Sequence, residues 1–311
     1  MCCVLRTSKH ENAKYVIRNT VRTMFKKIGI ILEMIKFEHT IFALPYAVMS
    51  AFLASNGWPN LLKILWILVA MVGARSCAMA FNRIADMKYD KINPRTSNRA
   101  LPAGLIKMSA VWIFTITSAL IFIFAAYMLN RLAFVLSPLA LLVILVYSYS
   151  KRFTTLTHLW LGLSLAIAPV GAWIAIKGEF AFVPLLLGLA VMLWTAGFDI
   201  IYACQDKEFD EKFGIYSIPK RFGIKRALQI SSAMHLITVL VLLSLPLLSE
   251  LRYIYLSGVG LVSILLVYEH AIVKPNDLSR VNLAFFTLNG MVSLGLMVMS
   301  VADIIFATYT N

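Results

Sequence analysis

The sequence has little negative charge. Only 15 of its 311 residues are Asp or Glu, against 29 Lys or Arg, and charged residues together make up 14% of the chain. Soluble domains carry about 25% charged residues and at most about half apolar residues. This chain is 60% hydrophobic, with a mean hydropathy of +0.80. The composition excludes an ordinary soluble domain and predicts a membrane protein.

The sequence also lacks the patterns of a disulfide framework, of a cleaved signal peptide and of a membrane β-barrel. The chain has four cysteines, Cys2, Cys3, Cys77 and Cys204, which are too scattered to predict a disulfide framework. The N-terminus lacks a short apolar core followed by a small-residue cleavage site, so we expect no cleaved signal peptide. The apolar stretches lack the polar–apolar alternation of a membrane β-barrel, which leaves helices as the spanning element.

Nine apolar stretches approach the length of roughly 20 residues that a helix needs to cross a bilayer. They lie near residues 40–56, 61–82, 108–128, 133–149, 157–176, 182–203, 227–248, 253–271 and 282–304. The sequence therefore predicts an all-α membrane protein with one nine-helix domain over residues 37–311. Residues 1–36 combine basic residues with apolar ones at helical spacing, which predicts an amphipathic segment at the membrane surface.

The basic residues are distributed unevenly about these spans. With nine spans, 24 of the 29 Lys and Arg fall in the N-terminal segment and the loops on its side of the membrane. Cytoplasmic loops carry such an excess. We therefore expect a multi-pass protein of the inner (cytoplasmic) membrane with a cytoplasmic N-terminus and active-site loops, and with the C-terminus outside. The net charge of +14 then reflects topology, and no nucleic-acid partner is expected.

The scarce acidic residues gather in two short stretches. In the first, FNRIADMKYD (residues 81–90), Asn82, Asp86 and Asp90 recur at every fourth position and share one helix face. Arg75 and Met79 extend this row into the apolar span. Two long polar loops are expected on the cytoplasmic side, near residues 83–107 and 204–226. Loops of this length are usually functional or disordered.

The second stretch is DIIYACQDKEFD, residues 199–210. Its Asp199, Tyr202, Asp206 and Asp210 also fall on one face if the helix continues. Both rows lie at the cytoplasmic ends of their spans, which predicts that they face one cavity.

A carboxylate in the apolar layer costs roughly 2.5–3.5 kcal/mol, so it faces the protein interior and needs a cation. Mg²⁺ is held by carboxylates together with phosphate oxygens. The two rows therefore predict a Mg²⁺–diphosphate site with the ligands Asn82, Asp86, Asp90, Asp199, Asp206 and Asp210. The basic residues of the neighbouring loops are candidate phosphate partners: Arg95, Arg99, Lys107, Lys151, Arg152, Lys207, Lys220 and Arg221. The rival hypothesis is a cation-coupled transporter, whose charges would lie nearer the membrane midplane.

The motifs resemble those of a known family. NRIADMKYD and DIIYACQDKEFD resemble the two Asp-rich motifs of the UbiA superfamily of intramembrane aromatic prenyltransferases. RTSNRALPAG (residues 95–104) resembles the family pattern RTxxRPLPxG, with Ala100 in place of the usual Pro. YSYSKRFT, residues 147–154, resembles the family segment after the fourth span. The nine-helix plan is similar as well.

Within the family, the chain is most similar to the 4-hydroxybenzoate polyprenyltransferase branch. It departs in KFEHTIFALPY (residues 36–46), where that branch commonly has an Arg-x-Asp-Lys-Pro pattern. Here Lys36, Glu38 and His39 stand in that region, which is thought to border the acceptor pocket. The departure resembles a subgroup of which some members serve menaquinone synthesis by the futalosine route, with a dihydroxynaphthoic acid as acceptor.

The resemblance implies an enzyme of quinone biosynthesis. It would transfer a polyprenyl group from a polyprenyl diphosphate to the ring of 4-hydroxybenzoate or a similar hydroxylated aromatic acid, with Mg²⁺ as cofactor. The same transfer to dihydroxynaphthoate is the alternative. The expected catalytic residues are Asp86, Asp90, Asp199, Tyr147 and Tyr202, where the tyrosine rings would face the allylic cation. The acceptor carboxylate needs a cationic partner, for which Lys36, His39 and Arg75 are candidates, with Lys151 beside them.

Overall fold

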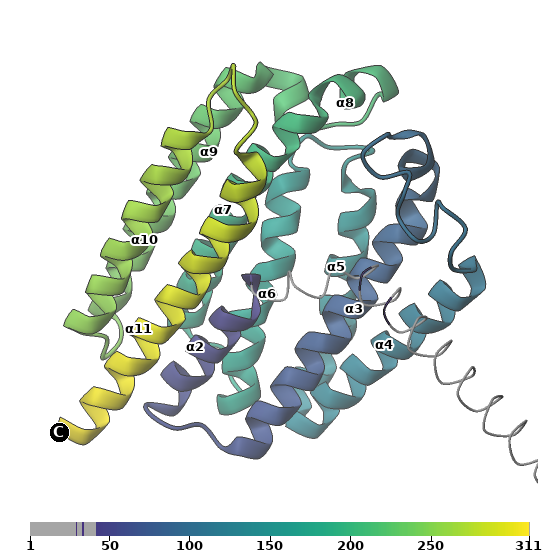
Figure 1. Cartoon of the computed structure of the whole chain (residues 1–311). Coiled ribbons are helices and arrows are strands. Elements are labelled where there is room, and N and C mark those ends of the chain that lie inside the picture. Colours follow the sequence, from purple (N-terminus) through teal and green to yellow (C-terminus); the bar gives the residue numbers. More distant parts are fainter. Residues whose placement is uncertain (1–28, 30–32, 34–41, 311) are drawn as a thin grey trace, which may run out of the picture.

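The computed structural model describes residues 29, 33 and 42–310, and its regular elements are helices (Figure 1). The long helices are α2 (Leu44–Ser55), α3 (Leu61–Ile92), α4 (Met108–Leu129), α5 (Arg131–Ser150), α6 (Thr157–Lys177), α7 (Phe182–Ala203), α9 (Ile218–Ser244), α10 (Tyr253–Ile272) and α11 (Asn289–Thr310). Shorter pieces are η2 (Cys204–Asp206), α8 (Lys207–Phe213), η3 (Leu245–Leu247) and the π-helical turn η4 (Leu283–Leu288).

Eight helices in the described part of the chain are long and apolar enough to cross a membrane. The predicted all-α membrane fold is therefore confirmed. The ninth, α2, has 12 residues, and at about 1.5 Å per residue it is shorter than the roughly 30 Å apolar layer. Apart from Gly29 and Glu33, the predicted amphipathic segment 1–36 lies outside the described residues, so the boundary at residue 37 stays a prediction.

The helices extend further than the apolar composition indicated. Helix α3 continues to Ile92, well beyond the predicted end at residue 82, so the acidic row of the first motif is helical throughout. The second expected loop, residues 204–226, is also mostly helical, because η2 and α8 follow α7 directly and α9 begins at Ile218. A kink at Gly223, with φ of 76°, separates the first turn of α9 from its apolar part.

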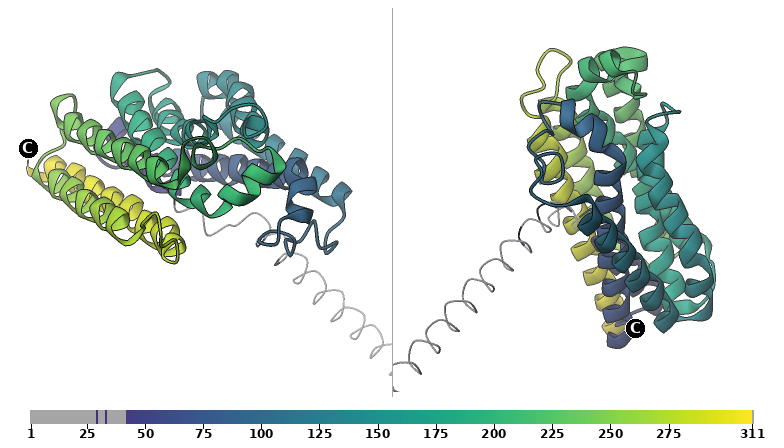
Figure 2. Two further views of the ribbon diagram at one scale, coloured as in Figure 1. Left: turned by 90° about the horizontal axis from the view of Figure 1, so that it is seen from above. Right: turned by 90° about the vertical axis from the view of Figure 1, so that its right-hand side faces the viewer.

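The helices pack as an antiparallel bundle. Helix α3 lies along α4, α6 along α7, α7 along α9, and α10 along α11 (Figure 1). In the two turned views, α10 and α11 form an outer pair at one edge of the bundle (Figure 2). Helix α7 is the most buried of the spans. Its Trp194 packs edge-on against Phe198, with ring centroids 4.9 Å apart, and contacts Tyr46 of α2.

A buried polar cluster fixes α7 from the side of the C-terminal helices. The indole Nε1 of Trp194 donates to Asn289 Oδ1 at 2.7 Å, and Asn289 Nδ2 donates to Glu269 Oε1 at 2.9 Å. The ring nitrogen Nε2 of His235 lies 3.2 Å from the carbonyl oxygen of Trp194. Hydrogen bonds between helices join spans that gain little from apolar contact in lipid. The cluster therefore ties α7 to α9, α10 and α11.

Helices α6 and α7 also approach each other closely. A Cβ built on Gly162 of α6 would lie 2.1 Å from the carbonyl oxygen of Met192, whereas a Cβ on Gly171 of the same helix would meet nothing within 4 Å. The close approach fixes where α6 meets the acidic end of α7.

Replacing each of the two glycines by alanine should therefore have different effects on stability. We expect Gly162→Ala to lower the thermal unfolding midpoint of the detergent-solubilised protein, because overpacking costs about 1–3 kcal/mol. Gly171→Ala is the matched control and should leave the midpoint unchanged or raise it, since Ala favours helix over Gly by up to about 1 kcal/mol. Equal midpoints for the two variants would contradict the close packing.

Candidate active site

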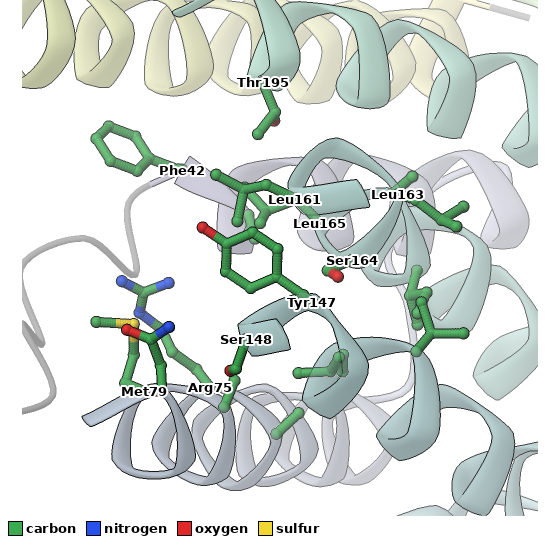
Figure 3. A pocket seen from close by; sticks show the side chains of 18 of the residues that line it. Phe42, Arg75, Met79, Tyr147, Ser148, Leu161, Leu163, Ser164, Leu165 and Thr195 are labelled. Carbon is green, nitrogen blue, oxygen red and sulfur yellow. The ribbon is translucent and has the colours of Figure 1, made fainter. Parts of the chain in front are cut away.

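A cavity of about 890 Å³ lies between α3, α5, α6 and α7. Most of its acidic and basic side chains come from the ends of these helices and the adjoining loops, whereas residues deeper in the spans, apart from Arg75 of α3, give it mainly apolar walls. Figure 3 shows Tyr147 in the cavity, with Arg75 and Met79 on one side of it and Thr195 on the other. The apolar walls include Phe122, Leu136, Val143, Leu161, Leu165 and Leu189.

The first acidic row lies on α3, as its spacing predicted, and lines this cavity. Asp86 is buried, and its Oδ2 accepts hydrogen bonds from Lys151 Nζ at 2.6 Å and from Asn82 Nδ2 at 3.2 Å. Asp90 is also buried and receives Arg99 Nη1 at 2.8 Å and 2.9 Å on its two oxygens. These carboxylates are thus compensated by cations from other segments.

The second row comes from three consecutive pieces of helix. Asp199 is on α7, Asp206 in η2 and Asp210 on α8, and all three line the cavity. The sequence predicted one continuous face, but the 3₁₀ turn of η2 interrupts it. Asp199 Oδ2 lies 2.7 Å from His158 Nδ1, and Asp210 Oδ2 accepts the hydroxyl of Ser217 at 2.7 Å.

Arg95 joins the two halves of the site. It belongs to the segment 93–107 after α3, yet its Nε and Nη2 donate to the two oxygens of Asp206 at 3.0 Å and 2.5 Å, and its Nη1 donates to Tyr202 Oη at 2.9 Å. Burial acts to lower the pKa of Arg95, but the charge and hydrogen bond of Asp206 outweigh it and raise the pKa. Both acidic rows therefore open on the same end of one cavity.

The donor set fits a divalent cation. No group of three His, Cys, Asp or Glu within the described ranges is close enough to hold a metal ion by itself. Mg²⁺, however, usually takes one or two carboxylates and completes its shell with water and substrate phosphates. Asp86 Oδ1 is buried without a hydrogen-bond partner, although such an atom costs about 1–3 kcal/mol or more. A cation at this oxygen would satisfy it.

Some of the remaining candidate residues line the cavity and others do not. Arg99 and Lys151 line the cavity, as do Tyr147, Tyr202 and Arg75. The structure does not bring Arg152 or Lys207 into the lining. Arg152 donates to the carbonyl of Ala85 and lies 4.6 Å over the Tyr149 ring, and Lys207 Nζ pairs with Glu211 at 2.7 Å. Lys36 and His39 lie outside the described residues.

Several cavity residues were not predicted from the sequence. His158 and Ser217 hold two of the second-row carboxylates. The hydroxyls of Ser148 and Thr195 line the cavity, are buried and have no hydrogen-bond partner. Thr195 stands four positions before Asp199 and shares its helix face, which is a signal that the sequence did contain.

Two relatives are similar to this chain over most of its length. The chain is 30% identical over 250 residues to a protein of Aeromonas hydrophila subsp. hydrophila named 4-hydroxybenzoate octaprenyltransferase, which covers 80% of this chain and 87% of that protein. It is 28% identical over 254 residues to a protein of the same name from Francisella tularensis subsp. novicida, covering 81% of this chain and 88% of the relative.

Solved structures share the fold. The apo structure of a UbiA homolog from Aeropyrum pernix K1 matches with a TM-score of 0.75 and 33% identity, over 87% of this chain and 98% of that one. A UbiA homolog from Archaeoglobus fulgidus, bound to GPP and Mg²⁺, matches with a TM-score of 0.67 and 23% identity, over 89% of this chain and 99% of that one. The model of the UbiA prenyltransferase family matches residues 43–291, and this multi-pass membrane protein therefore belongs to the UbiA prenyltransferase family.

Proposed function

We propose that the protein transfers a polyprenyl group from a polyprenyl diphosphate to the ring of 4-hydroxybenzoate or a similar hydroxylated aromatic acid. The observation that carries this proposal is the cavity itself. Acidic residues from α3 and from α7–α8 meet at one end of it, and the rest of its wall is mainly apolar. A diphosphate with an isoprenoid tail has the same division between a charged head and an apolar chain. The names of the relatives support the aromatic acid as acceptor.

Asn82, Asp86, Asp90, Asp199, Asp206 and Asp210 would hold Mg²⁺ at the charged end. Bound Mg²⁺ would supply Lewis-acid stabilisation of the negative charge that develops on the leaving diphosphate. The Archaeoglobus fulgidus homolog, which shares the fold, is bound to GPP and Mg²⁺.

The basic residues would serve the diphosphate in a second role. Arg95, Arg99 and Lys151 each lie within hydrogen-bond distance of a carboxylate in this structure. Once a divalent cation neutralises those carboxylates, the same side chains are available to donate to phosphate oxygens, a charge-assisted contact that Arg makes especially well. On substrate binding, these basic side chains would thus exchange carboxylate partners for phosphate partners, and no further cationic residues would be needed.

The chemical step exchanges one bond for another. The C1–O bond of the prenyl diphosphate breaks, and the electron pair leaves with the diphosphate. Tyr147 and Tyr202 would offer ring faces to the allylic cation. A ring carbon of the acceptor then bonds to C1, and the displaced ring proton passes to an Asp of the second row or to the released diphosphate. The helices around the cavity and segment 93–107 would keep water from the cation.

The acceptor needs a cation for its carboxylate. Arg75 is suited to this role because it lines the cavity two turns before Asn82 on the same helix (Figure 3). Lys36 and His39 remain proposed partners from the preceding segment. Their departure from the benzoate-branch pattern favours a second candidate acceptor, dihydroxynaphthoate, as in menaquinone synthesis. The test is to supply membranes containing the protein with a prenyl diphosphate, Mg²⁺ and each acid in turn.

We further propose that the protein lies in the inner (cytoplasmic) membrane, with the acidic end of the cavity facing the cytoplasm and the C-terminus outside. The excess of Lys and Arg on the side of the acidic motifs supports this orientation. The isoprenoid tail would extend along the apolar walls toward the lipid bilayer, which accounts for a cavity embedded among membrane spans.

Removing one carboxylate from either row should strongly reduce transfer. We expect Asp86→Asn and Asp199→Asn each to lower kcat/KM for prenyl transfer by about 100-fold or more, because electrostatic groups at developing charge contribute about 10²–10³. Glu208→Gln is the matched control, since Glu208 is exposed on α8 outside the cavity lining. Wild-type rates in both Asp variants would defeat the assignment of the site. Mg²⁺-independent cation flux through proteoliposomes, without transfer, would favour the transporter.

Arg75 should affect the acceptor selectively. We expect Arg75→Gln to raise the KM for the aromatic acid by about 10- to 100-fold, since a hydrogen bond to a charged group contributes about 1.5–3 kcal/mol. The KM for geranyl diphosphate, measured in the same assay, should stay within about threefold of wild type. A parallel rise in both KM values would instead place Arg75 at the diphosphate or in the fold.

A further inference from the structure

His158 occupies a position between the two ends of the second acidic row. It is the second residue of α6, its side chain is buried, and it lines the cavity. Its Nδ1 lies 2.7 Å from Asp199 Oδ2, and its Nε2 lies 3.4 Å from the backbone nitrogen of Ile218. The ring thus joins α7 to the first turn of α9.

These two contacts determine which ring nitrogen carries the proton. The backbone N–H of Ile218 can only donate, so Nε2 of His158 accepts this hydrogen bond. Nδ1 of the ring therefore carries the hydrogen and donates it to Asp199. One Asp199 oxygen is occupied by this bond, and the orientation of the carboxylate is fixed by a ring that is itself held at its other end.

The N-terminus of α9 holds the carboxylate at the other end of the row. Ser217, the N-cap of α9, donates its hydroxyl to Asp210 Oδ2 at 2.7 Å and accepts from the backbone nitrogen of Lys220 at 3.3 Å. Ser217 and Ile218 are neighbours in the chain. Asp199 and Asp210 are therefore linked through His158, one peptide unit and Ser217.

The start of α6 is fixed as well. The hydroxyls of Thr157 and Ser150 lie 2.6 Å apart, and both side chains are buried. This contact joins the first residue of α6 to the last residue of α5, one position before Lys151. Lys151 in turn pairs with Asp86 of the first row. The position of His158 is thus set relative to both rows.

We propose that His158 is a positioning residue that acts through Asp199. It holds this carboxylate in the orientation in which it binds the Mg²⁺–diphosphate, and it couples that orientation to the α9 turn that holds Asp210. This inference rests on the proposed function. Residues that hydrogen-bond to metal ligands typically contribute 10- to 100-fold to metal affinity.

Three variants separate the two contacts of the ring. His158→Asn places an amide nitrogen close to the position of Nδ1. This side chain can still donate to Asp199, but it is too short to reach Ile218. His158→Gln places its terminal amide close to the position of Nε2. It keeps the contact with Ile218 but loses the contact with Asp199. Leu makes neither hydrogen bond.

The measurement is Mg²⁺ binding rather than turnover. The apparent Kd for Mg²⁺ is obtained from the shift of the thermal unfolding midpoint of the full-length protein in detergent, with geranyl diphosphate at saturation and no acceptor. We expect His158→Asn to stay within about threefold of wild type, and His158→Gln and His158→Leu to weaken binding about 10- to 100-fold. In transfer assays, His158→Gln should raise the KM for Mg²⁺ more than it lowers kcat.

A control and two contrary outcomes complete the test. His270→Asn should leave the apparent Kd unchanged, because His270 contacts His235 on α9 rather than a cavity residue. Equal Kd values for the Asn and Gln variants, whether at the wild-type level or weakened together, would reduce His158 to a packing residue and overturn the proposal. A wild-type protein whose midpoint does not respond to Mg²⁺ with geranyl diphosphate would instead overturn the proposed function.

Discussion

Negative charge held within a membrane domain must be compensated, and this constraint governs the arrangement of the whole acidic end of the bundle. Asp86, Asp90 and Asp206 each pair with a Lys or Arg side chain, and Asp199 contacts a histidine. Most of these partners come from segments that are remote in the sequence. The loops after α3 and α5 are thus held over the cavity by the carboxylates that the cavity contains. In the proposed function, Mg²⁺ bound with the substrate would take over this compensation.

The two acidic rows are supported differently. Asp199 is on α7, which is fixed by close packing on Gly162 of α6 and by the buried hydrogen bonds of Trp194. The first row lies on the polar end of α3, and its partners Arg99 and Lys151 are half-exposed side chains from connecting segments. The second row is thus held by a buried histidine, by Ser217 and by Arg95, whereas the cations that hold Asp86 and Asp90 include partly exposed side chains from connecting segments. Under the proposed function, such a division would suit a site that admits a diphosphate and then surrounds it.

Sequence reasoning was most accurate where a single helix contains the whole pattern. The row Asn82, Asp86, Asp90 lies on one face of α3, as its spacing of four required. The predicted end of α3 was wrong, because a polar helical stretch beside a cavity has the composition of a loop. For the same reason residues 204–226 were expected as a loop and are mostly helical. The 3₁₀ turn at Cys204–Asp206 had no sequence signal, so the second row was expected on a continuous helix.

The sequence by itself determined the membrane class, the succession of helices and the residue types of the site, because these depend on composition and on periodicity within short segments. Only the tertiary structure decided which residues meet. Arg95 reaches Asp206 across 111 positions, and His158 reaches Asp199 across 41. Such pairs depend on how helices cross and how far each one extends. These distances result from packing between segments, and no local pattern in the chain encodes them.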